Sequence, residues 1–284
     1  FEAADGVAQV NLIGTELGRI NLELARATPG SANQSALLDR RDAMLEQLSS
    51  FGDVTTTFAP DQTVEVRLGG NGGPLLVSGV TVSSLAMTTA ADGTISFTLG
   101  AAPLALAGGS LAGKAQALVA VRDTALDLDA LADSLIAAAN GAQGAGVALD
   151  GSAGQPMFSG SGAAGIALAL TAGSQIATAP TGAGAGSRDP AGLNALINAL
   201  DTADLAGQAN GLLFAASSRA AGSRLTAEAL DTIAAGARIA LDSQAGVNLD
   251  DEAVNLVRFQ QAFQASSKAI QVASDVIDTL LALN

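Results

Sequence analysis

Three short stretches of the sequence hold residue types that could do chemistry, and the first is the glycine-rich GSGAAG. Its Gly160, Gly162 and Gly165 have the spacing of a dinucleotide-binding loop, in which a phosphate lies at the N-terminus of a helix. The IALALT that follows alternates like a strand, and no acidic residue stands about 20 positions further on to hold a ribose. The pattern therefore argues against a nucleotide site.

The second stretch, DLDALAD, offers the carboxylates of Asp127, Asp129 and Asp133 as metal ligands. A calcium loop needs oxygens that converge around a sharp turn containing glycine. This run lies instead within a strongly helical pattern, so we interpret it as a solvated polar face of a helix.

The third stretch, LLDRRD, places two carboxylates beside two guanidinium groups, at Asp39, Arg40, Arg41 and Asp42. Such a group could polarise a substrate. Clusters of this kind more often pair helices and fix their register. We therefore interpret these residues as a structural ion-pair cluster.

Missing residue types limit the chemistry further. The chain has no His and no Cys, which excludes a Ser–His–Asp triad, a Cys–His pair and ordinary zinc sites. It has no Trp and no Tyr, so aromatic platforms for sugars or bases are not expected. Only carboxylate chemistry or Asp/Glu metal binding remains. We predict a protein that is not an enzyme and that needs no cofactor, metal or nucleotide to fold.

The net charge of the chain limits the classes of molecule that it could bind. The chain has 27 acidic and 13 basic residues and a net charge of −14, which argues against binding nucleic acid or an anionic membrane surface. No apolar run approaches the roughly 20 residues that span a bilayer. No signal peptide is visible, and because the sequence starts at Phe1 we expect a fragment or a processed form.

Candidate interaction residues lie on a helix at the C-terminal end. Leu249, Leu256, Phe263, Ile270 and Ile277 stand seven apart, and Phe259 and Leu280 belong to a second set three residues further on. This heptad period predicts a helix, about 50 Å long, that packs along another helix. Either it is the core helix of an ordinary bundle, or it is a helix for self-assembly or partner docking. Similar seams are expected over residues 10–24 and 118–135.

The segments between these helices have the alternation of strands. TVEVRL places Val64, Val66 and Leu68 on one face, LLVSGVTV reads as a strand, and ADGTISFTL predicts a turn followed by a strand. We predict an α+β fold, in which an elongated helical bundle domain is built from the N- and C-terminal helices and a small β-rich domain is inserted. The helical domain comprises residues 1–52, 113–140 and 188–284, and the β-rich, Gly/Ala-rich outer domain comprises residues 53–112 and 141–187.

Several of these stretches together resemble one family. LLDRRD (residues 37–42) is similar to the LLDQRD motif of the bacterial flagellar hook-associated protein 1 family. GVNLDDEAVNLVRFQQAFQASSKAI resembles its C-terminal signature, where Tyr often stands at the positions of Phe259 and Phe263. Its middle motif, a long helix ending in Asn and then a Gly-Asp-Gly-Gly-Phe spacing, is matched by Asn140, Gly146, Asp150, Gly151, Gly154 and Phe158. From this resemblance we expect that the sequence lacks the family's N-terminal segment, which would precede the helix of residues 10–24.

The resemblance implies a structural subunit that joins the flagellar hook to the filament and assembles through its terminal helix. It implies export through the flagellar type III channel without a cleavable signal peptide and an extracellular place in the flagellum. The implied partners are identical subunits, the hook protein, the second hook-associated junction protein and an export chaperone. Rival interpretations are a flagellin or another axial protein, a secreted surface adhesin on a helical stalk, and an enzyme that acts through carboxylates alone.

Overall fold

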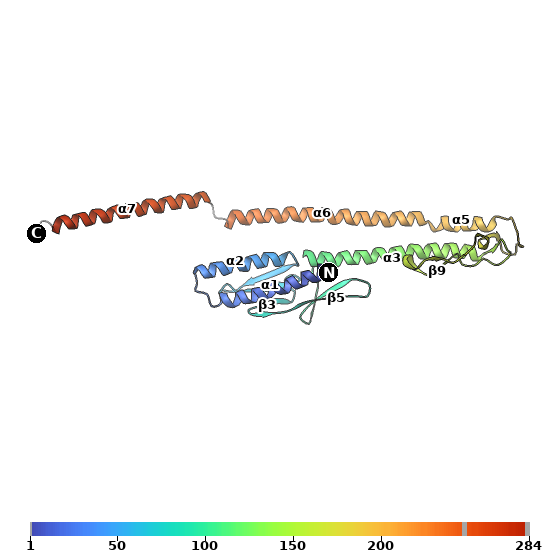
Figure 1. The fold of residues 1–284 in the computed structure, drawn as a ribbon, viewed down its shortest axis with the longest axis horizontal. Coiled ribbons are helices and arrows are strands. Elements are labelled where there is room, and N and C mark those ends of the chain that lie inside the picture. Colours follow the sequence, from blue (N-terminus) through green and yellow to red (C-terminus); the bar gives the residue numbers. More distant parts are fainter. Residues whose placement is uncertain (1, 246–248, 282–284) are drawn as a thin grey trace. The chain divides into compact units, whose positions relative to one another are not determined.

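The computed structural model describes residues 2–245 and 249–281, and the chain divides into two compact units, Phe1–Phe214 and Ala215–Asn284. The fold is α+β, as predicted, with long helices and small antiparallel sheets (Figure 1). The helices are α1 (Glu2–Leu24), α2 (Ala32–Ser49), α3 (Gly109–Gly144), α4 (Gly162–Gly165), α5 (Ala191–Ala203), α6 (Leu205–Ala245) and α7 (Leu249–Leu281), with a 3₁₀ turn at Gly173–Gln175. The strands are β1 (Val54–Phe58), β2 (Val64–Leu68), β3 (Leu75–Ser78), β4 (Thr81–Val82), β5 (Leu85–Thr89), β6 (Ile95–Leu99), β7 (Ala102–Leu104), β8 (Gly146–Ala148), β9 (Phe158–Ser159), β10 (Ala167–Leu168) and β11 (Ala177–Pro180).

The apolar seam of α1 is buried, but its main partners are strands and α2. Val10, Ile13 and Leu17 belong to one core with residues of β2, β3, β5 and β6. Glycines on α1 let the β3–β4 hairpin come close, since a Cβ at Gly18 would lie 2.9 Å from a methyl of Val82. The predicted helix–helix contact is therefore present between α1 and α2, where Ile20 and Leu24 pack with Leu37, and the strands cover the rest of the α1 seam. A helical period reveals one apolar stripe, and a sheet can cover that stripe as well as a helix can.

The strands near the N-terminus form two antiparallel sheets, ordered β1-β2-β3-β4 and β5-β6-β7. The predicted inward face of β2 is confirmed, because Val64, Val66 and Leu68 are all buried. LLVSGVTV is two strands, β3 and β4, because Gly79 has a φ of 57° and turns the chain back. The predicted β6 strand is also confirmed, with Phe97 and Leu99 in the core.

Three turns repeat one local device, an Asp followed two residues later by Thr or Ser. The Asp oxygen accepts the backbone N–H of Thr63, Thr94 or Ser152 at 3.1, 3.0 or 2.8 Å. The residue between the two has a positive φ, which is 81° at Gly93 and 68° at Gln62. These hydrogen bonds, first of all those from the Thr94 and Ser152 side chains, lower the pKa of their Asp partners.

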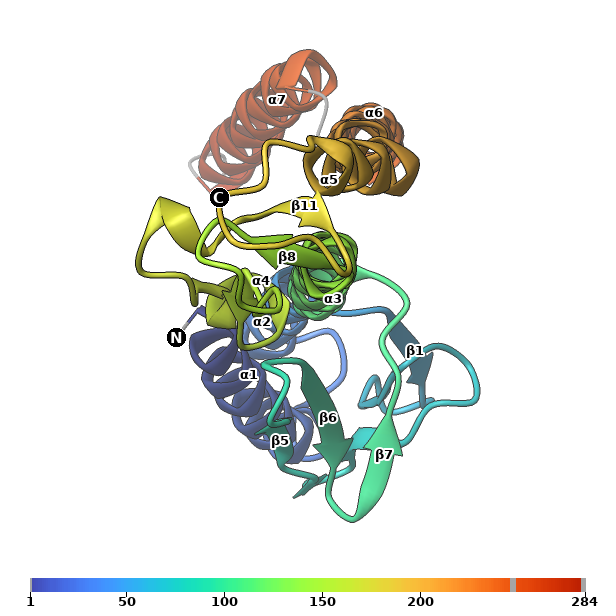
Figure 2. The same ribbon diagram turned by 90° about the vertical axis from the view of Figure 1, so that its right-hand side faces the viewer.

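The second β-rich segment packs around the C-terminal half of α3 and does not join the first. β8 pairs with β11 and β9 with β10, in sheets separate from β1–β7 (Figures 1 and 2). α5 lies against β11 and α3, because Gly192 brings its backbone so close that a Cβ there would be 2.7 Å from the Ala177 carbonyl. The strands of residues 53–112 and 141–187 thus lie in separate sheets, and the predicted grouping of these residues into one outer domain stays a prediction. The long α3 separates the segments, which the strand patterns alone could not reveal.

The helices α6 and α7 form the C-terminal part of the chain. α6 follows α5 after Asp204, whose φ of 45° breaks the helix, and α7 lies within the second unit. The predicted bundle of residues 249–283 with the N-terminal helix concerns the relation of the two units and stays a prediction. Of the helices over the described ranges 2–245 and 249–281, none has the length and hydropathy required to cross a bilayer.

Candidate assembly surface

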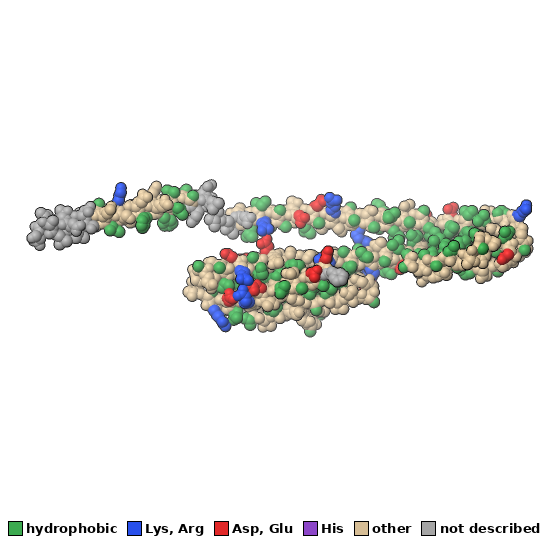
Figure 3. Space-filling view, viewed as in Figure 1, with side chains coloured by type: hydrophobic (Ala, Val, Ile, Leu, Met, Phe, Trp, Pro, Cys, Tyr) green, Lys and Arg blue, Asp and Glu red, His purple; other side chains and the backbone are tan. Residues whose placement is uncertain are grey.

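The strongest candidate surface is the apolar face of α7. Leu256, Phe259, Phe263 and Ile270 are spaced three, four and seven residues apart, so they share one face of the helix. All four are exposed, Phe259 by 76% and Phe263 by 75%. Leu249, Ile277 and Leu280 also lie within the bounds of α7, but their side chains are outside the described residues. Figure 3 shows hydrophobic side chains along this helix.

The opposite face of α7 has a different character. Arg258, Gln261 and Lys268 lie about half a turn away from Phe263 and are also exposed. Among the described residues of the second unit this apolar stripe stays exposed to solvent. The other side of the helix is more polar, although it also exposes Val254 and Val272. Leaving such a stripe in water costs free energy that a packed partner would recover.

The charged residues of LLDRRD make two separate sets of contacts, one through Arg40 and one through Arg41. Arg40 forms an ion pair with Glu16 at 2.7 Å and so joins α2 to α1. Glu16 also accepts from Arg19 at 2.6 Å, and that hydrogen bond is the first cause of the lowered pKa of Glu16. Asp39 is exposed on α2. Because Arg40 is exposed too, its ion pair orients the helices more than it stabilises them.

Arg41 makes the stronger contact. Its guanidinium is almost completely buried, donates to Asp42 Oδ1 at 2.8 and 2.7 Å, and donates to the Gln62 carbonyl at 2.7 Å. It also lies over the Phe58 ring, 4.5 Å from the centroid. Arg41 thereby ties α2 to the turn between β1 and β2. The arrangement holds the hairpin in place and engages the Arg41 guanidinium in contacts within the protein.

Four helix amides, of which the motifs in the sequence single out only Asn140, hold strands and loops by their backbones. On α1, Asn11 and Asn21 each donate to and accept from one residue, Leu85 and Val64 respectively. On α3, Asn140 makes the same pair of bonds with Phe158, at 2.8 and 2.9 Å. Gln143, the fourth, is buried and bonds to the backbone of the segment that leads into β11.

Asn140, the one named by the resemblance, shows what the middle motif does. Asn140 holds Phe158, and Gly154 packs so tightly that a Cβ there would be 1.8 Å from the Gln143 carbonyl oxygen. Gly151 supplies a φ of 89°. The motif is therefore a folding signal. For the other amides, the available signal was a polar residue within an apolar helical stripe, as Asn21 is between Leu17 and Leu24.

The GSGAAG and DLDALAD stretches meet in space. The α4 turn directs its backbone N–H groups at α3, where Gly162 N donates to Asp133 and Ala163 N donates to Asp129, both at 2.8 Å. Carboxylates therefore occupy the donors that a phosphate would need, which removes the nucleotide interpretation. Within the described part of the chain, no group of three or more acidic residues is placed to hold a metal ion.

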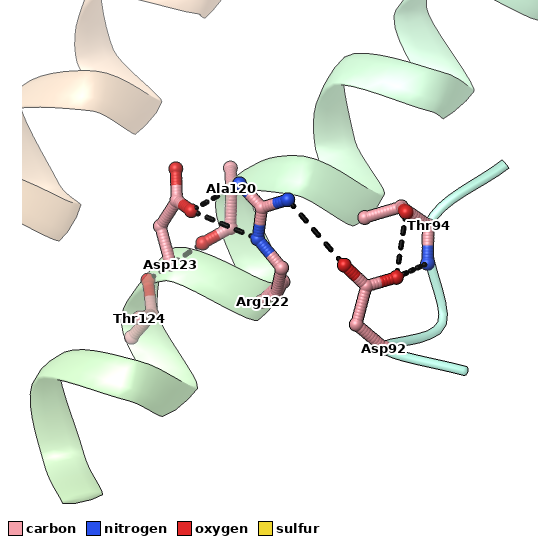
Figure 4. Close-up of polar contacts among 6 residues, drawn as sticks. All are labelled: Asp92, Thr94, Ala120, Arg122, Asp123 and Thr124. Carbon is pink, nitrogen blue, oxygen red and sulfur yellow. Dashed lines mark hydrogen bonds and ion pairs between the residues drawn. The ribbon is translucent and has the colours of Figure 1, made fainter. Parts of the chain in front are cut away.

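A further polar contact ties α3 to the β5–β6 turn. Arg122 donates to its neighbour Asp123 at 2.6 and 3.1 Å and reaches Asp92 at 3.5 Å (Figure 4). Asp92 in turn accepts from the Thr94 hydroxyl at 2.6 Å and from its backbone N–H. These groups are partly or fully exposed and saturate one another, so the contact is structural and offers no reactive group.

Comparisons with known proteins find similar families for two parts of the chain. Residues 1–158 match the family model "Flagellar hook-associated protein FlgK helical domain", and residues 242–283 match "Flagellar basal body rod FlgEFG protein C-terminal". Among solved structures, the flagellar hook junction protein FlgK from Burkholderia pseudomallei is 27% identical, with a TM-score of 0.47 over 56% of this chain and 30% of that one. The chain thus spans less than a third of that protein. Among curated proteins, no sequence matches.

Proposed function

This chain belongs to the family of flagellar hook-associated proteins, and from this premise we propose that it is a structural subunit that joins the hook to the filament. The observation that carries the proposal is the match of the helical domain over residues 1–158, more than half of the chain. The family is structural and not enzymatic. The family assignment places the chain in the flagellum, and we propose that it reaches the outside of the cell through the flagellar export channel.

We propose that the subunit assembles through α7. Its stripe of Leu256, Phe259, Phe263 and Ile270 is exposed, and the C-terminal match covers this helix. The proposed partners are identical subunits, the hook protein and the second hook-associated protein, with an export chaperone before assembly. Any of these partners would remove the apolar side chains of the stripe from water. This burial stabilises a complex by roughly 25 cal/mol per Å² of apolar surface.

The side-chain hydrogen bonds to backbone groups and the ion pairs of the first unit support a different role for that unit. Asn21, Arg41 and Asn140 fix strands against helices through short hydrogen bonds, which makes a stiff body. A stiff body is suited to transmit torque from the hook to the filament, because packed protein interiors have low compressibility. The structural role of the first unit and the assembly role of α7 can be separated by mutation.

A single charge placed on the α7 stripe tests the proposal. Phe263→Asp puts a carboxylate where a partner helix would dock, and leaving it unpaired in an interface costs several kcal/mol, or roughly a thousandfold in affinity. Gln261→Asp is the matched control, because it adds the same charge on the opposite, polar face of α7. Each variant is expressed in cells that lack the wild-type protein.

The expected result is that Phe263→Asp cells lose motility and shed filament protein into the medium, while Gln261→Asp cells swim. The purified Phe263→Asp protein should keep the unfolding free energy of its first unit. Normal swimming of the Phe263→Asp cells would refute the assembly role of α7. Global unfolding of that variant would make the stripe part of the monomer core, and an equal defect in the control would show that charge alone disturbs assembly.

A further inference from the structure

The chain holds three Asn–Gly pairs, at Asn71, Asn140 and Asn210, and the structure gives them very different surroundings. Asn140 and Asn210 lie within α3 and α6, where the following glycine N–H belongs to the helical hydrogen-bond ladder. The Asn140 side chain is held further by both backbone groups of Phe158. Asn71 and Gly72 instead form the exposed tip of the β2–β3 turn.

We propose that Asn71 is a site of spontaneous deamidation, a covalent modification that needs no enzyme. The deprotonated backbone nitrogen of Gly72 attacks the side-chain carbonyl carbon of Asn71. A carbon–nitrogen bond forms, ammonia leaves with the proton it requires, and a five-membered succinimide results. Water then opens either carbonyl of the ring, so the products are aspartate and isoaspartate. Over both steps, ammonia is lost and water is gained.

The local geometry supports this reaction at Asn71. The two ends of the turn are pinned, since Gly73 N donates to the Gly70 carbonyl at 3.0 Å and Arg67 donates to the Gly73 carbonyl at 3.0 Å. Between them, Asn71 and Gly72 are exposed to water and hydroxide. Gly72 has no side chain to block the approach of its nitrogen, and asparagine is among the residues that heat damages.

The helical pairs are internal controls for this argument. Their nitrogens reach the carbonyl carbon only after the helix opens locally, and an opening free energy of only about 1.4 kcal/mol slows a reaction about tenfold. Gly72→Ala is a suitable variant. A Cβ at Gly72 would meet no atom within 4 Å, and its φ is outside the left-handed region, so the substitution leaves the turn unstrained. Gly211→Ala is its matched control, because a Cβ at Gly211 also meets nothing.

The experiment incubates the full chain in mildly alkaline buffer and follows each Asn–Gly peptide by mass spectrometry. Asn71 should convert at least roughly tenfold faster than Asn140 and Asn210 and give two products of equal mass, while all three convert at similar rates in denaturant. Gly72→Ala should slow Asn71 by about tenfold, because its Cβ hinders the attack, and Gly211→Ala should not. Equal rates at the three sites in the folded chain, or a Gly72→Ala chain that converts as fast as the wild type, would overturn the proposal.

Discussion

Replacing Asn21 by Leu should destabilise the first unit more than any surface change of similar size. Asn21 is only 1% exposed, donates to the Val64 and Gly79 carbonyls at 2.8 Å each, and accepts the Val64 N–H at 2.8 Å. Leucine fills a similar volume but makes none of these bonds. The Val64 groups are buried and would lose this partner, at about 1–3 kcal/mol each, whereas exposed Gly79 can bond to water. The expected loss is therefore about 3 kcal/mol.

Urea unfolding measures this loss as a lower midpoint with an unchanged slope. Asn33→Leu is the matched control, since Asn33 is exposed on α2, and it should change the unfolding free energy by less than about 0.5 kcal/mol. A loss below about 1 kcal/mol for Asn21→Leu would refute the reasoning, because it would mean that the backbone of β2 finds other partners without Asn21.

Two further outcomes follow from the charged contacts of α2 and α1. Arg41→Lys should lower the unfolding free energy by about 1–2 kcal/mol, because lysine cannot keep both the paired bonds to Asp42 and the stacking on Phe58, whereas exposed Arg40→Lys should change it by less than about 0.5 kcal/mol in the same urea assay. The pKa of Glu16 is lowered in the folded state, so the stability it contributes is present above its unfolded pKa and is lost as the pH falls through the folded one. As the pH is lowered into the acid range, the melting temperature of Glu16→Gln should accordingly fall less steeply than that of the wild type. Equal slopes of melting temperature against pH would contradict this.

Much of the local structure could be predicted from the sequence, because it depends on local rules. Alternation located β2 and β6, and helical periods located α1, α3 and α7. The grouping of segments could not be predicted in the same way. Gly18 and Gly192 set how closely a strand approaches a helix, and a glycine in sequence does not reveal what it will contact. The Arg41 contact was likewise hidden, because Phe58 and Gln62 lie in a hairpin remote from LLDRRD in sequence.

The same limit explains why the candidate surface was easier to predict than the interior. A stripe such as that of Phe259 and Phe263 is a property of one helix, so its period is complete in the sequence. A clamp such as Asn140 with Phe158 joins residues 18 apart, and Asn21 with Val64 joins residues 43 apart. Such pairs form only after the chain has closed the intervening loop. The proposed assembly through α7 would require no such closure within the chain. The stripe can therefore be complete in each subunit before a partner arrives, which suits a subunit that is added to a growing structure.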